Sequence, residues 1–296
     1  MDVRKTNAVV TVNPFSKRES HSPKAIITYK VLTLLTWLLA VVVSAYYSVE
    51  SPADDLKHGR TIPGQNLLNL SGFTLNFPLV AIYFVVLFIL QIGYVLHLFS
   101  GDIDKVNAAA SVGSHFILNN LLHFAFVMLF TRAHFAWAEV ILIINFFNLS
   151  SLAFRHNTYP RFIHAPVVSG PLAWTFVAIY WNGAIAVPHS ESLVARIFAN
   201  IFVWSILAYG LFFLVAYKDY TIGFWLSILA AALGVSQFLD SIIALQWIFA
   251  FVIMAVLFSL SSVIAVSTWT GRELGFGKRT THDNGDAERA PLLSDN

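Results

Sequence analysis

The sequence predicts an all-α protein, a polytopic transmembrane helix bundle of about eight spans with both termini in the cytoplasm. Of its 296 residues, 57% are hydrophobic and 11% are charged, whereas about a quarter of the residues are charged in a soluble domain. Long apolar runs recur from Val31 to Trp269, and about 20 such residues suffice for a membrane-crossing helix. Most of these runs lack the polar face that a soluble amphipathic helix carries.

Eight runs are expected to be helical spans, because a helix satisfies its own backbone hydrogen bonds in lipid. The expected spans are residues 29–49, 77–99, 107–130, 134–154, 167–187, 193–217, 221–239 and 241–269. The division at Asp240-Ser241 is the weakest boundary, and seven spans with a re-entrant segment is the alternative count. The polar segments 1–28 and 270–296 are expected to be disordered cytoplasmic tails.

Lysine and arginine predict the orientation, since cytoplasmic loops carry an excess of both residues. With a cytoplasmic N-terminus, fourteen of the 18 fall on the cytoplasmic side, and the far side holds Lys57, Arg60, Arg132 and Arg196. This bias supports an even number of spans. The far-side loop 50–76 contains Asn69-Leu70-Ser71, so Asn69 is a candidate glycosylation site.

Composition and missing motifs narrow the functional classes. The formal net charge of +2 gives no strong attraction for nucleic acid, so the lipid bilayer is the expected partner. The absence of cysteine excludes thiolate metal sites and thiol nucleophiles. The sequence also contains no Walker loop, H-E-x-x-H, G-x-S-x-G or clustered histidine boxes. We therefore expect no metal and no cofactor, and we name no catalytic residue.

The third span places polar side chains where lipid is expected, in SHFILNNLLHF. His115, Asn119 and His123 recur every fourth residue, so they are expected to form one stripe on a helix. Asn120 lies beside this stripe. Histidine in a membrane span is a candidate for proton-linked function, because its charge changes near neutral pH.

The fourth span carries a matching set of polar residues. The turn between the two spans is short, so they are expected to be antiparallel neighbours. Folding the hairpin at residue 132 or 133 places Asn120 level with Asn145, and residues 116–117 level with Asn148. An interhelical hydrogen-bond seam is one interpretation, and a candidate intramembrane polar site is the other.

Two carboxylates lie inside the expected spans, Glu139 and Asp240. We include Glu139 in the candidate polar site. Alternatively, Glu139 forms an ion pair with Arg132, which lies seven residues earlier on the same helix face. Trp181-Asn182-Gly183 late in the fifth span predicts an interfacial helix end.

The cytoplasmic tails contain two short patterns that sorting adaptors read. Asn13-Pro14-Phe15 is typical of an endocytic signal. Glu288, followed after three residues by Leu292 and Leu293, is similar to an acidic dileucine signal. These patterns predict sorting adaptors as partners and an endomembrane location, vacuolar or endosomal.

Four segments suggest a family, namely NPFSKRESHSPKAIITYK, GSHFILNNLLHF, INFFNLSSLAFRHNTYPRFIHAPVVSGPLAW and FLVAYKDYTIGF. Over roughly residues 13–269 the chain resembles a fungal family of multi-span membrane proteins described as a domain of unknown function. The resemblance implies an integral membrane protein of fungal origin and assigns no catalytic or binding residue.

Three functions are compatible with the sequence. The first is a small-solute or proton-linked transporter that uses the polar stripe. The second is a non-catalytic scaffold or cargo partner, and the third is an intramembrane enzyme that acts on a lipid. We favour transport over catalysis, because the sequence shows no nucleophile–base or metal constellation.

Overall fold

The computed structural model describes residues 15, 21–55, 57–155, 160–187, 192–240 and 243–271. Every regular element over these residues is helical, and eight helices are long and apolar enough to cross a membrane. The all-α class and the eight-helix count are therefore confirmed. The eight helices have the following bounds: Pro23–Val49, Phe77–Leu98, Ile103–Thr131, Phe135–Arg155, Arg161–Ala186, Leu193–Ala216, Tyr220–Asp240 and Gln246–Thr270.

Six of these helices are continuous, and two are assembled from shorter pieces. The continuous ones are α1 (Pro23–Val49), α3 (Phe77–Leu98), α4 (Ile103–Thr131), α5 (Phe135–Arg155), α10 (Tyr220–Asp240) and α11 (Gln246–Thr270). The fifth consists of α6 (Arg161–His164), the π-helix η1 (Ala165–Ser169) and α7 (Gly170–Ala186). The sixth consists of α8 (Leu193–Phe202) and α9 (Trp204–Ala216), and the loop after α1 forms the short α2 (Ile62–Leu68).

Two helices begin earlier in the chain than hydropathy predicts, because each has a capping residue in front of it. Before α1, Ser22 accepts a hydrogen bond from the Ala25 amide and Pro23 occupies the first turn, a favourable start for a helix. Before α4, Asp102 accepts from the Asp104 amide. Both helices therefore begin in polar sequence that hydropathy excludes from a span.

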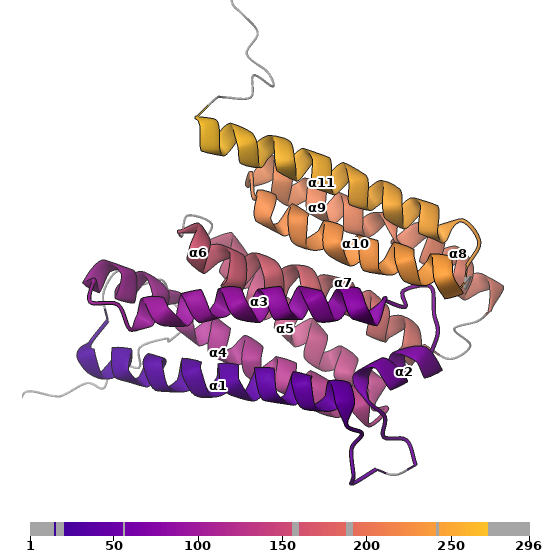
Figure 1. Cartoon of the computed structure of the whole chain (residues 1–296), viewed down its shortest axis with the longest axis horizontal. Coiled ribbons are helices and arrows are strands. Elements are labelled where there is room, and N and C mark those ends of the chain that lie inside the picture. Colours follow the sequence, from indigo (N-terminus) through magenta and orange to yellow (C-terminus); the bar gives the residue numbers. More distant parts are fainter. Residues whose placement is uncertain are drawn as a thin grey trace, which may run out of the picture.

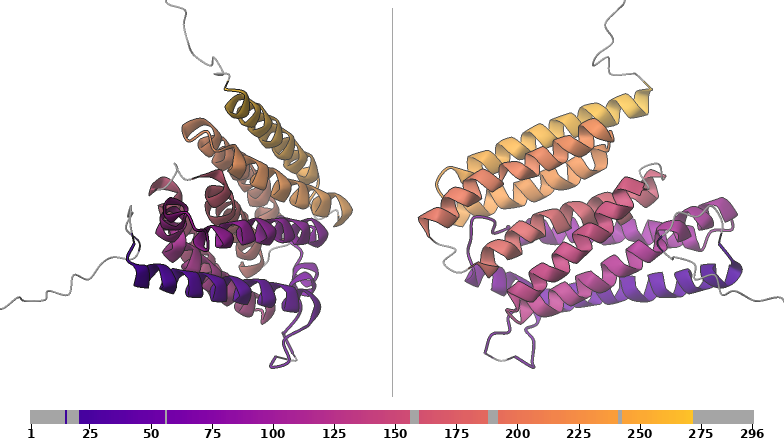
Figure 2. Two further views of the ribbon diagram at one scale, coloured as in Figure 1. Left: turned by 60° about the vertical axis from the view of Figure 1, so that its left-hand side comes forward. Right: turned by 180° about the vertical axis from the view of Figure 1, so that it is seen from behind.

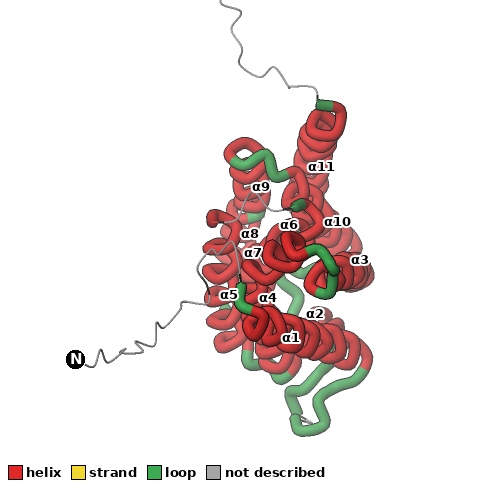
Figure 3. Tube along the Cα trace, turned by 90° about the vertical axis from the view of Figure 1, so that its left-hand side faces the viewer, coloured by secondary structure: helices red, strands yellow, loops and turns green. Residues whose placement is uncertain are grey.

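The helices pack as a bundle in which α4 and α10 have central positions. Helix α1 packs on α4, α4 on α5, and α5 on α7, while α10 contacts α3, α7, α9 and α11 (Figures 1 and 2). Seen nearly end on, α9, α10 and α11 group on one side, and α1, α4 and α5 on the other (Figure 3). The chain enters α1 and leaves α11 at the same end of the bundle, at the left of Figure 1.

Small residues allow α11 to approach both α10 and α9 closely. A Cβ atom added at Gly223 of α10 would overlap Ser261 Oγ of α11, and one at Gly210 of α9 would meet Leu257 of α11 at 2.5 Å. Close backbone approach through small residues is the usual basis of helix association in membranes.

The π-helix η1 leaves one carbonyl that needs a partner from another helix. In the π pattern the carbonyl of Pro166 would accept from the amide of residue 171. That residue is Pro171, which has no amide hydrogen. Gln91 of α3 donates from Nε2 to the Pro166 carbonyl at 3.1 Å instead. Tyr83 of α3 likewise donates to the Gly170 carbonyl at 2.7 Å, so α3 is bound to the irregular segment.

Candidate functional site

The polar residues of α4 and α5 meet in a buried interhelical seam. Asn148 donates from Nδ2 to the carbonyl of His115 at 3.1 Å, and its Oδ1 lies 2.8 Å from His115 Nδ1. Asn145 donates from Nδ2 to Oδ1 of Asn119 at 3.0 Å. The seam contains the expected residue types but not the expected pairs. Asn119, rather than Asn120, meets Asn145, and His115, rather than residues 116–117, meets Asn148.

The observed pairs differ from the expected ones by the choice of fold point. Three residues, Arg132 to His134, separate α4 from α5, and Ala133 has a φ of 59°. A fold point at residue 132 gives the observed pair Asn119–Asn145, and the pair His115–Asn148 lies one residue from that register.

The side-chain amides of the seam all donate in a defined order, because the backbone carbonyl of His115 determines how the first amide is oriented. The carbonyl of His115 can only accept, so the Asn148 atom next to it is the Nδ2 donor. The same Nδ2 contacts Asn145 Oδ1 at 3.4 Å, Asn145 donates to Asn119, and Asn119 donates to Asn120 Oδ1 at 3.4 Å. The Nδ2 group of Asn120 is therefore the last donor, and it is buried without a partner in the described part of the chain.

His123 does not take part in the seam between α4 and α5. Its Nε2 lies 2.9 Å from Ser44 Oγ of α1, and its ring packs against Phe84 of α3. Residues eight apart on a helix differ by about 80° in direction, since each residue turns about 100°. The residues of the expected stripe therefore have different partners: His115 and Asn119 hydrogen-bond to α5, whereas His123 contacts α1 and α3.

His123 lies at a cavity of about 260 Å³ between α1, α2, α3, α4 and α7. The lining is almost entirely apolar and aromatic, and includes Phe84, Trp174 and Trp181, with Ser44 and His123 among its few polar groups. Ala45 of α1 and Val85 of α3 also line it and are exposed on the outside of the bundle. The cavity therefore opens between α1 and α3, toward the region where lipid is expected.

A second cavity of about 20 Å³ adjoins the first on its inner side. Both cavities are lined by Phe84, Phe88, His123 and Trp174. The smaller one adds the polar side chains of Gln91, Asn119 and Asn120. The end of the amide seam therefore meets the inner end of the apolar cavity.

Glu139 faces α7 and not Arg132. Its Oε2 accepts from Asn182 Nδ2 at 2.8 Å, and the same Nδ2 donates to the Phe135 carbonyl at 2.9 Å. The alternative of an ion pair between Glu139 and Arg132 is therefore wrong. Trp181 beside Asn182 is 3% exposed and donates to Asn66 Oδ1 at 2.8 Å, so it packs inside the bundle and is not an interfacial anchor.

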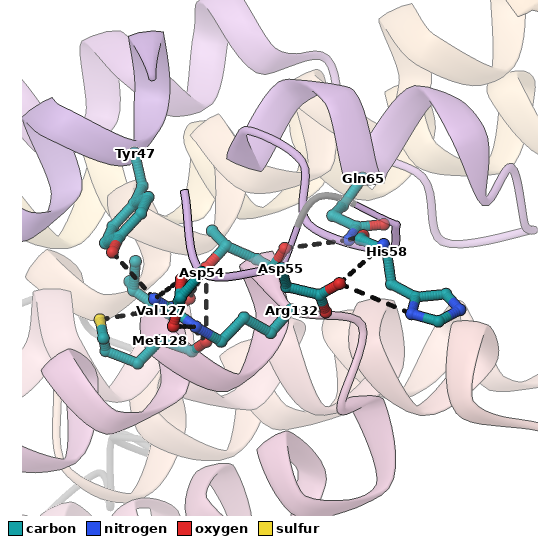
Figure 4. Close-up of polar contacts among 9 residues, drawn as sticks. Tyr47, Asp54, Asp55, His58, Gln65, Val127, Met128 and Arg132 are labelled. Carbon is teal, nitrogen blue, oxygen red and sulfur yellow. Dashed lines mark hydrogen bonds and ion pairs between the residues drawn. The ribbon is translucent and has the colours of Figure 1, made fainter. Parts of the chain in front are cut away.

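Arg132 instead forms hydrogen bonds with the end of α1 and the loop that follows it (Figure 4). Its Nη2 and Nε donate to the two carboxylate oxygens of Asp54 at 2.7 and 3.0 Å. Nη2 also donates to Tyr47 at 3.2 Å. The hydrogen bond from the guanidinium lowers the pKa of Asp54. Nearby, Gln65 of α2 donates to the His58 and Thr131 carbonyls, which holds the same loop against α4.

A further buried polar cluster lies at the ends of η1 and α10, and the sequence did not indicate it. His164 Nε2 lies 2.8 Å from Asp219 Oδ2, and Ser169 donates to the same oxygen at 3.0 Å. The Thr221 hydroxyl lies within hydrogen-bond distance of both Asp219 Oδ1 and Ser169 Oγ, and its single hydrogen can be donated to only one of them. Burial alone would raise the pKa of Asp219, but its hydrogen bonds from His164, Thr221 and Ser169 outweigh burial and lower it. His164 and Ser169 lie 55 and 50 residues from Asp219 along the chain, so spacing could not reveal these contacts.

The remaining candidate residues lie outside the bundle interior or outside the described chain. Asn69 donates from Nδ2 to the Gln65 carbonyl at 2.9 Å, and Ser71 of its sequon is 1% exposed. Glu288, Leu292 and Leu293 fall outside the described residues. Of Asn13-Pro14-Phe15, only Phe15 is described, and its ring meets His115 edge on at 5.0 Å. Among the described residues, no group of three or more His, Asp or Glu could hold a metal ion.

Comparison with known proteins confirms the resemblance to a fungal family. Residues 196–293 match the family model described as "Fungal protein of unknown function (DUF1774)". This match is shorter than the resemblance expected from the sequence, which covered roughly residues 13–269. Of the four segments that suggested the family, only residues 213–224 lie within the match. An uncharacterized protein of Schizosaccharomyces pombe is 26% identical over 130 residues, which is 44% of this chain and 44% of that relative. No solved structure matches the chain.

Proposed function

We propose that this membrane protein binds a mainly apolar, lipid-like molecule in the cavity between α1, α3 and α4, and carries it within the membrane. The observation that carries the proposal is the cavity itself, with about 260 Å³ of space and an almost entirely apolar lining. Binding sites for small molecules are typically apolar with a few placed polar groups. Ser44 and His123 supply such groups here.

The lining favours a lipid-like solute over a hydrophilic one. An ion or a sugar loses its hydration on entering a pore, and polar or charged lining groups must replace it. The residues of this cavity are mostly phenylalanine, valine and tryptophan. Ala45 and Val85 at its rim are exposed on helices long and apolar enough to cross a membrane, so we expect a molecule dissolved in the bilayer to enter the cavity without crossing water.

Photo-crosslinking in lipid nanodiscs tests binding. A long-chain alkyl diazirine is expected to label the wild type at residues of α1, α3 and α4 that line the cavity. Ala81→Trp places an indole in the cavity, and we expect labelling there to fall at least about five-fold, since filling a packed site excludes its occupant. Ile82→Trp is the matched control, because Ile82 is 57% exposed and lies outside the lining. Equal labelling of the two variants would refute the cavity as the site.

Carriage is tested separately, in vesicles that contain the same variants. Transfer of a fluorescent long-chain lipid between the two leaflets is expected to be faster with the wild type than in protein-free vesicles, and Ala81→Trp is expected to abolish the difference. Binding without faster transfer would leave a lipid-binding protein and reject the carrier.

One contact favours a second function, an intramembrane enzyme acting on a lipid ester. Ser44 Oγ and His123 Nε2 are 2.9 Å apart at the cavity, within the reach required of a nucleophile and its general base. A lipophilic fluorophosphonate would then label Ser44, and the label would disappear in Ser44→Ala and in His123→Gln. Absence of label in the folded wild type would exclude this function.

We also propose that both tails are cytoplasmic and direct the protein to the endomembrane system. The excess of Lys and Arg on the tail side supports the orientation, and the family match extends through Leu293 of the dileucine pattern. In fungal cells, replacing Leu292 and Leu293 by alanine is expected to move the fluorescently tagged protein away from the vacuole or endosomes. Unchanged localisation would reject the signal.

A further inference from the structure

Three residues that line the small cavity each carry a buried polar atom without a hydrogen-bond partner in the described part of the chain. The atoms are Oε1 of Gln91, Nδ2 of Asn120 and Nε1 of Trp174. The three residues are 2%, 2% and 5% exposed. Leaving such groups unpaired in a low-dielectric interior is costly, and three around one cavity indicate a site for a polar group.

The identity of each atom follows from its neighbours. Gln91 donates from Nε2 to the Pro166 carbonyl, which can only accept. Its other atom at the cavity is therefore the oxygen, an acceptor. Asn120 Oδ1 accepts from Asn119, so its free atom is the Nδ2 donor. The indole Nε1 of Trp174 can only donate.

Two donors and one acceptor are the complement of a hydroxyl group, which has one O–H donor and two acceptor lone pairs. A carboxylate or phosphate would place negative charge against Gln91 Oε1, and an ammonium would meet the two N–H donors. An ether or ketone has no hydrogen for Gln91. The volume of about 20 Å³ is close to one water-sized group.

We propose that the large cavity holds the hydrocarbon body of a lipid alcohol whose hydroxyl group occupies the small cavity between Gln91, Asn120 and Trp174. The proposal rests on the proposed lipid-binding function and specifies its ligand. Phe84, Phe88, His123 and Trp174 line both cavities, so one molecule can reach both. The hydroxyl oxygen accepts from Asn120 and Trp174 and its hydrogen is donated to Gln91.

The test compares two competitors against the diazirine probe in nanodiscs, a long-chain primary alcohol and its methyl ether. The ether keeps the chain and loses the donor. We expect the alcohol to compete at least about ten-fold better on the wild type. This preference tests the acceptor Gln91. Trp174→Phe removes one donor to the oxygen and keeps an aromatic ring, so it is expected to weaken competition by the alcohol about five-fold, the effect of one hydrogen bond, with probe labelling retained.

Trp37→Phe is the matched control, because Trp37 also has a buried indole N–H with no partner among the described residues but lines neither of these two cavities. Competition by the alcohol is expected to be as strong on this variant as on the wild type. Asn120→Leu provides a second variant with the same expected loss. Equal competition by alcohol and ether, with labelling intact, would overturn the hydroxyl site and leave the lipid-binding function in place. No labelling by the probe at all would overturn both.

Discussion

Asn145 of α5 donates a hydrogen bond from Nδ2 to Oδ1 of Asn119 on α4 at 3.0 Å, and both side chains are buried. This bond lies in the middle of a directed row of amides that begins at the His115 carbonyl and ends at Asn120 beside the cavity. The row therefore has two consequences. It stabilises the packing of α4 against α5, and it leaves the Nδ2 donor of Asn120 for the small cavity.

Asn148→Leu is expected to destabilise the protein by about 1 to 2 kcal/mol. The substitution removes three contacts, two with His115 and one with Asn145, and an interhelical hydrogen bond in a membrane is worth about 0.6 kcal/mol on average. Unfolding of the detergent-solubilised protein by SDS measures the change. Phe147→Leu at an adjacent, 67% exposed position is the control, and an equal loss in both would contradict a structural role for the seam.

Gly223→Ala is expected to destabilise the packing of α10 on α11 by about 1 to 3 kcal/mol, the usual range for overpacking. The added methyl group would overlap Ser261 Oγ and press on Leu214. Gly93→Ala on α3 is the control, since a Cβ atom there meets nothing within 4 Å. Thermal unfolding in detergent compares the two. Should both variants melt together with the wild type, the close approach of α10 and α11 would be wrong.

Asp219→Asn is expected to lower stability at neutral pH and to flatten its dependence on pH. The folded pKa of Asp219 is depressed, so its hydrogen bonds stabilise the fold above about pH 4, the ordinary pKa of aspartate. That contribution is lost as the pH falls through the lower folded value. Thermal stability measured from neutral pH down to about pH 3 would show the difference between wild type and variant shrinking with acidification. A constant difference would contradict the assignment.

Arg132→Met is expected to release the loop after α1 while the helices stay folded. The guanidinium is the shared partner of Asp54 and Tyr47, and the methionine keeps most of its apolar length. Limited proteolysis should cut the variant between α1 and α2 faster than the wild type. Lys57→Met, in the same loop, is the control; cleavage of the Arg132 variant at the wild-type rate would show that other contacts hold the loop.

The architecture of the bundle can be predicted from the amino-acid sequence alone. The length and hydropathy of a helix are local properties, so the eight helices could be predicted from the sequence. The predicted starts were too late at two helices, which begin after the capping residues Ser22 and Asp102. The sequence also identified the polar residues of α4 and α5, because periodicity along one helix reveals which residues share a face.

Which of these residues meet depends on how the whole bundle folds. His123 contacts Ser44 on α1 because helical rotation turns it away from the face of His115. Asp219 meets His164, and Gln91 meets Pro166, across intervals of 55 and 75 residues. The cavity is formed by five helices together. Such contacts depend on how each helix is rotated and where it crosses its neighbours, and these quantities are set by packing among distant segments.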